Sequence, residues 1–182
     1  MKKKFYLGMA ARMVPDKLHH LLIEIFSENR VFFSQNNIKL LFAGDGILIN
    51  SLKKKILDEK INKLIVFNGS LKEEELIKWF KKLDMYVHLS KDETTSTSII
   101  QAMSMSLPII ASNIGGNKNL LKFKDKRSNL ILVKNKKHDV YVKIEELIKN
   151  KEKRKKMSKL ARITAEKFYS CERMFKDYQK LF

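Results

Sequence analysis

The chain has 182 residues, with 38 Lys and Arg against 20 Asp and Glu, which gives a formal net charge of +18 at pH 7. Its length and its 44% hydrophobic content suit one folded domain and exclude wholesale disorder, and its one cysteine, Cys171, excludes an internal disulfide. No apolar run approaches the roughly 20 residues that span a bilayer, and the basic start is a poor signal peptide. We therefore expect a cytoplasmic protein.

Short apolar runs alternate with helical periodicity along the chain. The runs that we expect to form strands are 5–11, 38–43, 64–67, 85–89, 107–111 and 129–133. Apolar residues at helical spacing follow the first four runs, and the tail from Val140 onward holds three further helical stripes. This alternation predicts an α/β fold, with one doubly wound parallel sheet of about six strands over residues 1–168 and a C-terminal helix over 169–182.

Two cations follow the first predicted strand. In an open parallel sheet, ligands bind beyond the carboxyl ends of the strands. Arg12 and Lys17 lie five residues apart and flank the start of a helix, so they can grip a diphosphate, Arg12 as a fork and Lys17 as a point charge. Two solvated basic residues in a lysine-rich chain are the alternative interpretation.

Small residues follow the fourth and fifth predicted strands. Residues 94–98 are all Ser or Thr and lead into a helix, so they are good N-caps and keep backbone N–H groups accessible to an anion. An ordinary capped loop is the alternative. Gly115 and Gly116 then form a turn where the backbone can approach a ligand closely, whereas the lone Gly44-x-Gly46 lacks the third glycine of a dinucleotide site.

Metal and nucleophilic chemistry find little support. The four histidines, His19, His20, His88 and His138, are not at metal-ligand spacing with carboxylates, and we expect His19 and His20 to cap a helix or to be solvated. Cys171 has no nearby base in the sequence. We expect no bound metal and no cofactor.

The basic residues are concentrated in the C-terminal part, most densely in the Lys-Glu-Lys-Arg-Lys-Lys run at 151–156. Such a run is a solvated helix face, a contact with an anionic membrane, or a nucleic-acid surface. The basic residues show no aromatic interleaving and no helix-turn-helix pattern, so we do not expect nucleic acid as a partner.

Taken in order, these segments resemble the C-terminal, nucleotide-sugar-binding domain of family-4 glycosyltransferases, retaining enzymes of the GT-B fold. The resemblance covers almost the whole chain and rests on segments 7–17, 41–46, 66–69, 84–90, 93–103, 107–112 and 115–116. The most specific of them, 93–103, is similar to the family's segment of two glutamates separated by seven residues. The resemblance implies a Rossmann-like domain, which is half of a GT-B fold.

The resemblance also implies a function and a set of site residues. It implies transfer of a sugar from a nucleotide diphosphate sugar, such as a UDP- or GDP-sugar, in polysaccharide or glycoconjugate biosynthesis, usually without a metal. Arg12 and Lys17 would neutralise the diphosphate as it leaves, and Glu93 would be the catalytic residue that contacts the donor sugar. Other donor-binding residues would be Thr94, Thr95, Ser96, Thr97, Gln101, Gly115 and Gly116.

The chain departs from the family pattern at several positions. Gln101 stands where a glutamate binds the ribose diol, which removes the charge and one acceptor oxygen. Thr94 and Leu18 stand where glycine is common, and Asn119 where an acidic residue is common. A degenerate, non-catalytic nucleotide-binding or interaction domain is therefore the alternative function.

Members of the family carry two such domains, with the acceptor site on the N-terminal one. The resemblance therefore implies an acceptor domain, either as a separate chain or as a missing N-terminal domain. The helix over 169–182, with Phe175, Tyr178 and Phe182, would pack against it. Peripheral contact with an anionic membrane is a further expectation, from the basic tail.

Overall fold

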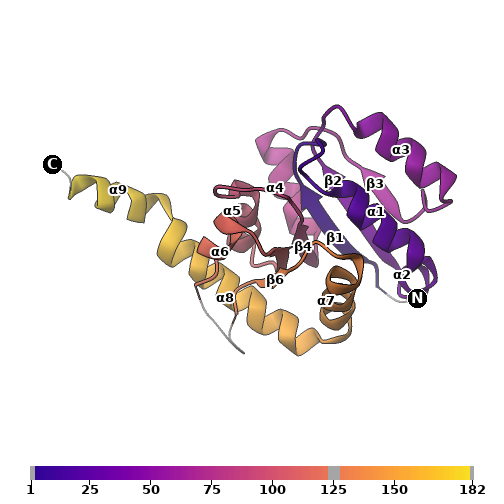
Figure 1. The fold of residues 1–182 in the computed structure, drawn as a ribbon. Coiled ribbons are helices and arrows are strands. Elements are labelled where there is room, and N and C mark those ends of the chain that lie inside the picture. The colour runs from indigo at the N-terminus through magenta and orange to yellow at the C-terminus, as the bar shows by residue number, and fades with distance from the viewer. Residues whose placement is uncertain (1–2, 123–127, 181–182) are drawn as a thin grey trace.

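The computed structural model describes residues 3–122 and 128–180. Six strands form one sheet in the order β3-β2-β1-β4-β5-β6, and every neighbouring pair is parallel (Figure 1). The strands are β1 Phe5–Ala10, β2 Ile38–Ala43, β3 Ile65–Phe67, β4 Met85–His88, β5 Ile109–Ser112 and β6 Ile131–Val133. The predicted fold class, a Rossmann-like doubly wound parallel sheet, is confirmed.

Helices follow the strands and cover both faces of the sheet (Figure 1). Their bounds are α1 His19–Glu28, α2 Arg30–Gln35, α3 Ile49–Asp58, α4 Glu73–Lys82, α5 Thr97–Ser104, α6 Gly115–Asn119, α7 Lys137–Lys149, α8 Lys151–Tyr169 and α9 Cys171–Gln179.

Alternate side chains of the central strands enter two separate hydrophobic cores. In β1, Leu7 and Met9 join the core formed with α1, α3 and α7, and in β4 Met85 and Val87 do the same. Tyr86 joins the opposite core, with α4, α5 and α8. Because both faces of these strands are buried, their sequences are apolar at consecutive positions rather than alternately.

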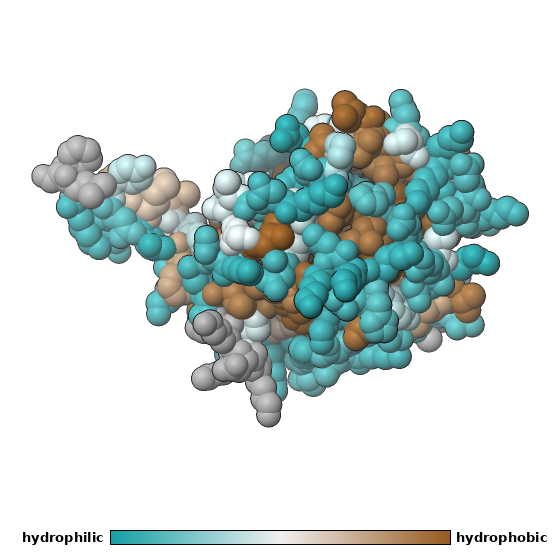
Figure 2. Space-filling view, in the orientation of Figure 1, coloured by the Kyte–Doolittle hydropathy of each residue, from teal (hydrophilic) through white to brown (hydrophobic). Residues whose placement is uncertain are grey.

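The C-terminal extension consists of α8 and α9. Helix α8 packs against α5, and α9 projects away from the sheet (Figure 1). Met174, Phe175 and Tyr178 of α9 are exposed, and Figure 2 shows pale brown atoms along one side of this arm and hydrophilic ones along the other. Phe182, which we expected on this apolar surface beside Phe175 and Tyr178, lies outside the described residues. The boundary at 168/169 and the docking of this segment on another domain stay predictions.

Within the described ranges, none of the helices combines the length and the apolar character that a membrane span requires.

His19 is buried, so the expectation that it caps a helix or is solvated was wrong. It is the first residue of α1 and is 0% exposed, and its ring packs edge-on against Phe42 with centroids 5.0 Å apart. Its Nδ1 lies 2.8 Å from the carbonyl oxygen of Lys17, while its Nε2 is buried without a partner among the described residues. Burial lowers the pKa of His19 to about 4, so the ring is neutral at pH 7.

This burial predicts a loss of stability in weak acid. The unfolded chain takes up a proton at His19 near pH 6.5, whereas the folded chain does so only near pH 4. The free energy of unfolding should therefore fall as the pH drops from 6.5 to 4, by about 3 kcal/mol in total, and stay constant in this respect above 6.5. Urea unfolding at several pH values measures it. The difference in the free energy of unfolding between wild type and His19→Gln isolates the contribution of His19, and the exposed His138→Gln is the control. The same dependence of the free energy of unfolding on pH in all three proteins would contradict the prediction.

Candidate functional site

The two central strands, β1 and β4, mark the point where the order of strands along the sheet reverses. Helix α1, after β1, covers one face of the sheet, and α5, after β4, covers the other, so the chain diverges at this point and leaves a crevice at the carboxyl ends. The two loops are joined across it: the Leu18 N–H donates to the Leu89 carbonyl at 3.1 Å, and the Lys91 N–H donates to the Asp16 carbonyl at 2.9 Å.

A cavity of about 190 Å³ lies in this crevice. Its lining residues are Ala10, Ala11, Arg12, Lys17, His88, Glu93, Thr95, Ser96, Thr97 and Ser98. Six of these, from two loops some 75 residues apart, are residues for which the sequence predicts donor binding or catalysis. The structure therefore brings Arg12 and Lys17 together with the Ser/Thr segment at one edge of the sheet.

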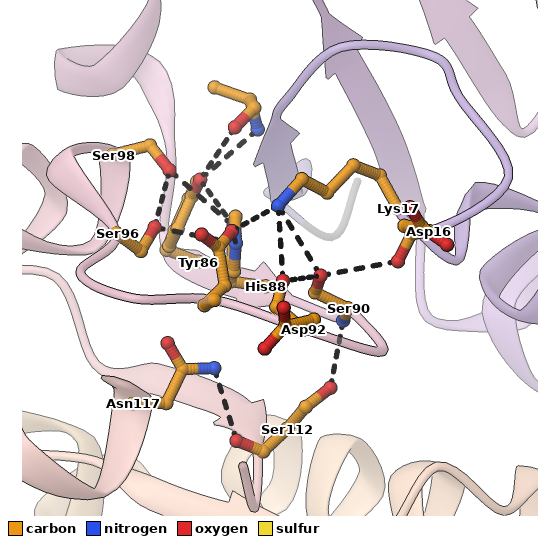
Figure 3. A network of polar contacts seen from close by, with 12 residues as sticks. Asp16, Lys17, Tyr86, His88, Ser90, Asp92, Ser96, Ser98, Ser112 and Asn117 are labelled. Atoms are coloured by element: carbon orange, nitrogen blue, oxygen red, sulfur yellow. Dashed lines mark hydrogen bonds and ion pairs between the residues drawn. The ribbon is translucent and has the colours of Figure 1, made fainter. Parts of the chain in front are cut away.

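Lys17 crosses the crevice to the loop after β4 (Figure 3). Its Nζ lies 2.5 Å from Glu93 Oε1, 3.3 Å from Ser90 Oγ and 3.5 Å from the Asp92 carbonyl oxygen. Arg12 is exposed, and its side chain forms no hydrogen bond or ion pair with any other described residue. One of the two predicted phosphate ligands is thus held by a carboxylate, and the other is available to an anion.

Glu93 receives a second contact, from His88. His88 Nε2 lies 2.7 Å from Oε1, the same oxygen that Lys17 contacts. The hydrogen bond from His88 and, to a lesser degree, the one from Lys17 lower the pKa of Glu93 to about 2, against the opposing effect of burial. Glu93 is therefore ionised at neutral pH and only accepts hydrogen bonds.

A buried polar network lies behind His88 (Figure 3). Its Nδ1 is 3.4 Å from both the Ser98 and Tyr86 hydroxyls, and its Nε2 is 3.3 Å from Ser96 Oγ. The Tyr86 hydroxyl donates to the Ala10 carbonyl and accepts from the Ala10 N–H, at 3.1 and 3.2 Å. Burial raises the pKa of Tyr86 well above its usual value, so the phenol stays protonated and ties the end of β1 to β4.

Ser96, one of the five Ser and Thr residues predicted to be good N-caps, is the N-cap residue of α5, but its hydroxyl does not cap the helix. No side-chain cap hydrogen bond is made there, and Ser96 Oγ instead lies 3.1 Å from Ser98 Oγ and close to His88. The N–H groups of the first turn of α5 are therefore left for other partners, at the end of the helix that favours an anion.

Four predicted site residues lie outside the cavity lining: Thr94, Gln101, Gly115 and Gly116. Gln101 is exposed on α5, and Thr94 and Gly115 are also exposed. Gly116 is buried, and its N–H donates to the Glu93 carbonyl at 2.9 Å. Its contact supports the backbone of Glu93, and the roles of all four toward a ligand stay predictions.

Sequence reasoning missed His88, Tyr86 and Ser98. A signal was available for His88. It is the last residue of β4, so it lies at the carboxyl edge of the sheet, five residues before Glu93. As for metals, residues 3–122 and 128–180 contain no group of three His, Cys, Asp or Glu side chains placed to hold an ion.

Comparison with known proteins agrees with this arrangement. The family model for glycosyl transferases group 1 matches residues 1–164. Alpha-monoglucosyldiacylglycerol synthase of Streptococcus pneumoniae is 27% identical over 81 residues, which are 44% of this chain and 18% of that protein. Sulfoquinovosyl transferase of Arabidopsis thaliana is 27% identical over 131 residues, 71% of this chain and 25% of that protein. The chain thus matches about a quarter or less of the length of these relatives.

Solved structures share the fold. A variant of S. aureus TarM, in complex with fondaparinux, alpha-GlcNAc-glycerol and UDP, superposes with a TM-score of 0.85 at 25% identity, over 99% of this chain and 36% of that one. Anabaena HepE in complex with UDP-glucose gives 0.85 at 18% identity, over 98% and 48%. The C-terminal domain of Francisella tularensis LpcC gives 0.81 at 20% identity, over 94% and 89%.

The match to the family model spans nine-tenths of the sequence, and the sheet order and the crevice at its switch point agree with it. This chain belongs to the glycosyl transferases group 1 family.

Proposed function

We propose that this domain binds the diphosphate of a nucleotide sugar at the β1–β4 crevice and serves as the donor half of a retaining glycosyltransferase. The observation that carries the proposal is the meeting of Arg12, Lys17 and the uncapped first turn of α5 around one cavity. All three attract anions, and they come from two separate loops, Arg12 and Lys17 after β1 and the start of α5 after β4. The bound UDP and UDP-glucose in the solved TarM and HepE structures support this ligand class.

The chemistry of transfer explains why cations belong at this place. As the bond between the anomeric carbon and the diphosphate oxygen breaks, its electron pair goes to the diphosphate. An acceptor hydroxyl oxygen bonds to the carbon in its place, and the proton of that hydroxyl passes to an oxygen of the departing diphosphate. Arg12 and Lys17 would stabilise the negative charge that grows on the leaving oxygen, which is the kind of interaction that lowers a barrier most. Lys17 would share its ammonium between the diphosphate and Glu93.

Glu93 would contact the donor sugar. It is ionised, lines the cavity, and keeps one carboxylate oxygen, Oε2, without a hydrogen-bond partner among the described residues. An ionised acceptor of this kind binds sugar hydroxyls more strongly than a neutral one. We place the reaction in polysaccharide or glycoconjugate biosynthesis in the cytoplasm, with an acceptor domain completing the cleft and an anionic membrane near the basic tail.

Isothermal titration calorimetry of the domain with UDP, GDP, UDP-glucose and UDP-N-acetylglucosamine tests this function. We expect one of the two nucleotides to bind at micromolar to millimolar concentration and inorganic phosphate to compete with it. Absence of binding by every nucleotide at millimolar concentration would overturn the proposal. Nucleotide binding without sugar transfer after an acceptor domain is supplied would instead identify a degenerate, non-catalytic domain.

Replacing Gln101 with glutamate is expected to tighten donor binding about three- to fivefold. The carboxylate restores a charged acceptor for the ribose diol, and charge-assisted hydrogen bonds are about twice as strong as neutral ones. Because Gln101 is exposed, solvent limits the gain. Calorimetry of the nucleoside diphosphate at 150 mM salt measures the effect, with Lys91→Gln on the neighbouring loop as a control for surface charge. Unchanged or weaker affinity would mean that Gln101 does not face the ribose.

A further inference from the structure

His88 and Lys17 both contact one oxygen of Glu93, and neither contacts the other. Lys17 Nζ and His88 Nε2 lie 2.5 and 2.7 Å from Oε1, Lys17 from the loop after β1 and His88 from the end of β4. These two contacts hold Oε1 in place. If Lys17 also binds a diphosphate, its ammonium is shared between two anions. Lys17 alone cannot then hold the Glu93 carboxylate in position, and the contact from His88 is needed as well.

The protonation of His88 follows from its neighbours. Since Glu93 is ionised and only accepts, Nε2 must carry a proton. On the other side of the ring, Nδ1 faces the hydroxyls of Ser98 and Tyr86, each at 3.4 Å. We assign the donor toward Glu93, Nε2–H, from this network of hydrogen bonds. His88 is only 2% exposed, so solvent does not compete for either nitrogen.

We propose that His88 is a positioning residue for Glu93, whose Nε2–H holds Oε1 in place and leaves Oε2 as the acceptor presented to a donor sugar. The consequence for the sugar rests on the proposed function, whereas the tie between the two side chains does not. His88 also lines the cavity, but its side chain is only 2% exposed, and its short contact is to Glu93, through which it would act on a sugar.

Two amide variants separate position from polarity. The side-chain N–H₂ of glutamine lies about where the Nε2 of histidine does, and that of asparagine lies about where Nδ1 does. His88→Gln should keep the hydrogen bond to Glu93, while His88→Asn should lose it, although both are neutral, polar and of similar size. Thermal unfolding of the two variants checks that both retain the fold.

The decisive measurement is the acid titration of the Glu93 carboxylate carbon by NMR in the ligand-free domain, with Glu93→Gln to assign the signal. We expect wild type and His88→Gln to titrate below pH 3, and the midpoint in His88→Asn to rise by about one unit, a tenfold change in acid constant. The same midpoint in all three proteins would overturn the proposal. If the variants do not fold, the nitrogen-15 shifts of His88 in wild type decide: a proton on Nδ1 rather than Nε2 would overturn it.

A binding experiment then connects His88 to the sugar. In His88→Asn, the affinity for UDP should stay within about twofold of wild type, while any gain in affinity from UDP to UDP-glucose or UDP-N-acetylglucosamine should fall about tenfold. Loss of UDP affinity itself would contradict a role confined to Glu93. If UDP does not bind the wild-type domain but the NMR titrations are as expected, the proposed function is overturned. The hydrogen bond between His88 and Glu93 is then still supported.

Discussion

Replacing Lys17 with alanine is expected to weaken nucleoside diphosphate binding about 100-fold, equivalent to about 3 kcal/mol. The variant loses a charge-assisted contact to phosphate. It also leaves Glu93, whose side chain is only 14% exposed, as a negative charge without its ammonium partner at the place where we propose that the diphosphate binds. Arg12→Ala should cost less, about tenfold, because Arg12 is exposed and has no carboxylate to release.

The double variant Lys17→Ala, Glu93→Gln separates these two contributions. Removing the unpaired carboxylate should restore about tenfold of the lost affinity, whereas Glu93→Gln alone should change UDP affinity little. Calorimetry measures all four proteins, and the exposed Lys91→Ala, one residue beyond Ser90 on the same loop, controls for general charge. An unchanged Kd in Lys17→Ala would remove this residue from the site.

Replacing Gly116 with alanine is expected to lower the free energy of unfolding by about 3 kcal/mol and the Tm by about 10 °C. A Cβ at this position would lie 2.1 Å from the carbonyl oxygen of Thr94 and 2.3 Å from that of Glu93. Both are backbone atoms, so the loop that carries Glu93 and Thr94 must itself move to relieve the contact. Any gain in affinity from UDP to UDP-glucose should fall with stability, because the same movement displaces Glu93.

Gly115→Ala is the matched control. Among the described residues, no heavy atom other than those of the adjacent residues and the backbone of α6 lies within 4 Å of a Cβ built on Gly115, which is exposed at the start of α6. Its stability should stay within about 0.5 kcal/mol of wild type. Differential scanning calorimetry of the two alanine variants compares adjacent positions with the same chemical change, and equal Tm values would contradict the prediction.

The strands were predictable because strands that are buried on both faces of a sheet consist of consecutive apolar residues, and such runs are visible in the sequence. The errors lie at strand ends, where other hydrogen bonds replace the sheet pattern. Asn129 was expected to open the sixth strand, but its side chain instead bonds the Lys122 N–H and the Leu120 carbonyl. The fifth strand was expected from Leu107 and begins at Ile109, after Pro108, which has no N–H to donate.

The site was predictable in its parts but not in its pairings. Arg12, Lys17 and the 94–98 run follow strand ends, and topology alone brings those ends together. The contact between Lys17 and Glu93 joins residues 76 positions apart, so no local pattern signals it. The roles of His88 and Ser98 were missed for a related reason: a histidine and a serine of this kind acquire meaning only from the carboxylate and the hydroxyl that face them in space.

The backbone bonds between the loops after β1 and β4 have a consequence for how a donor is captured. Two backbone hydrogen bonds, from Leu18 to Leu89 and from Lys91 to Asp16, join the loops on the two sides of the crevice. Between them, Lys17 and Ser90 form an isolated β-bridge. The walls are therefore preorganised, and little conformational entropy is lost from them when a ligand arrives. Under the proposed function, closure around a donor would then come from side chains or from the movement of this domain as a rigid body against the proposed acceptor domain.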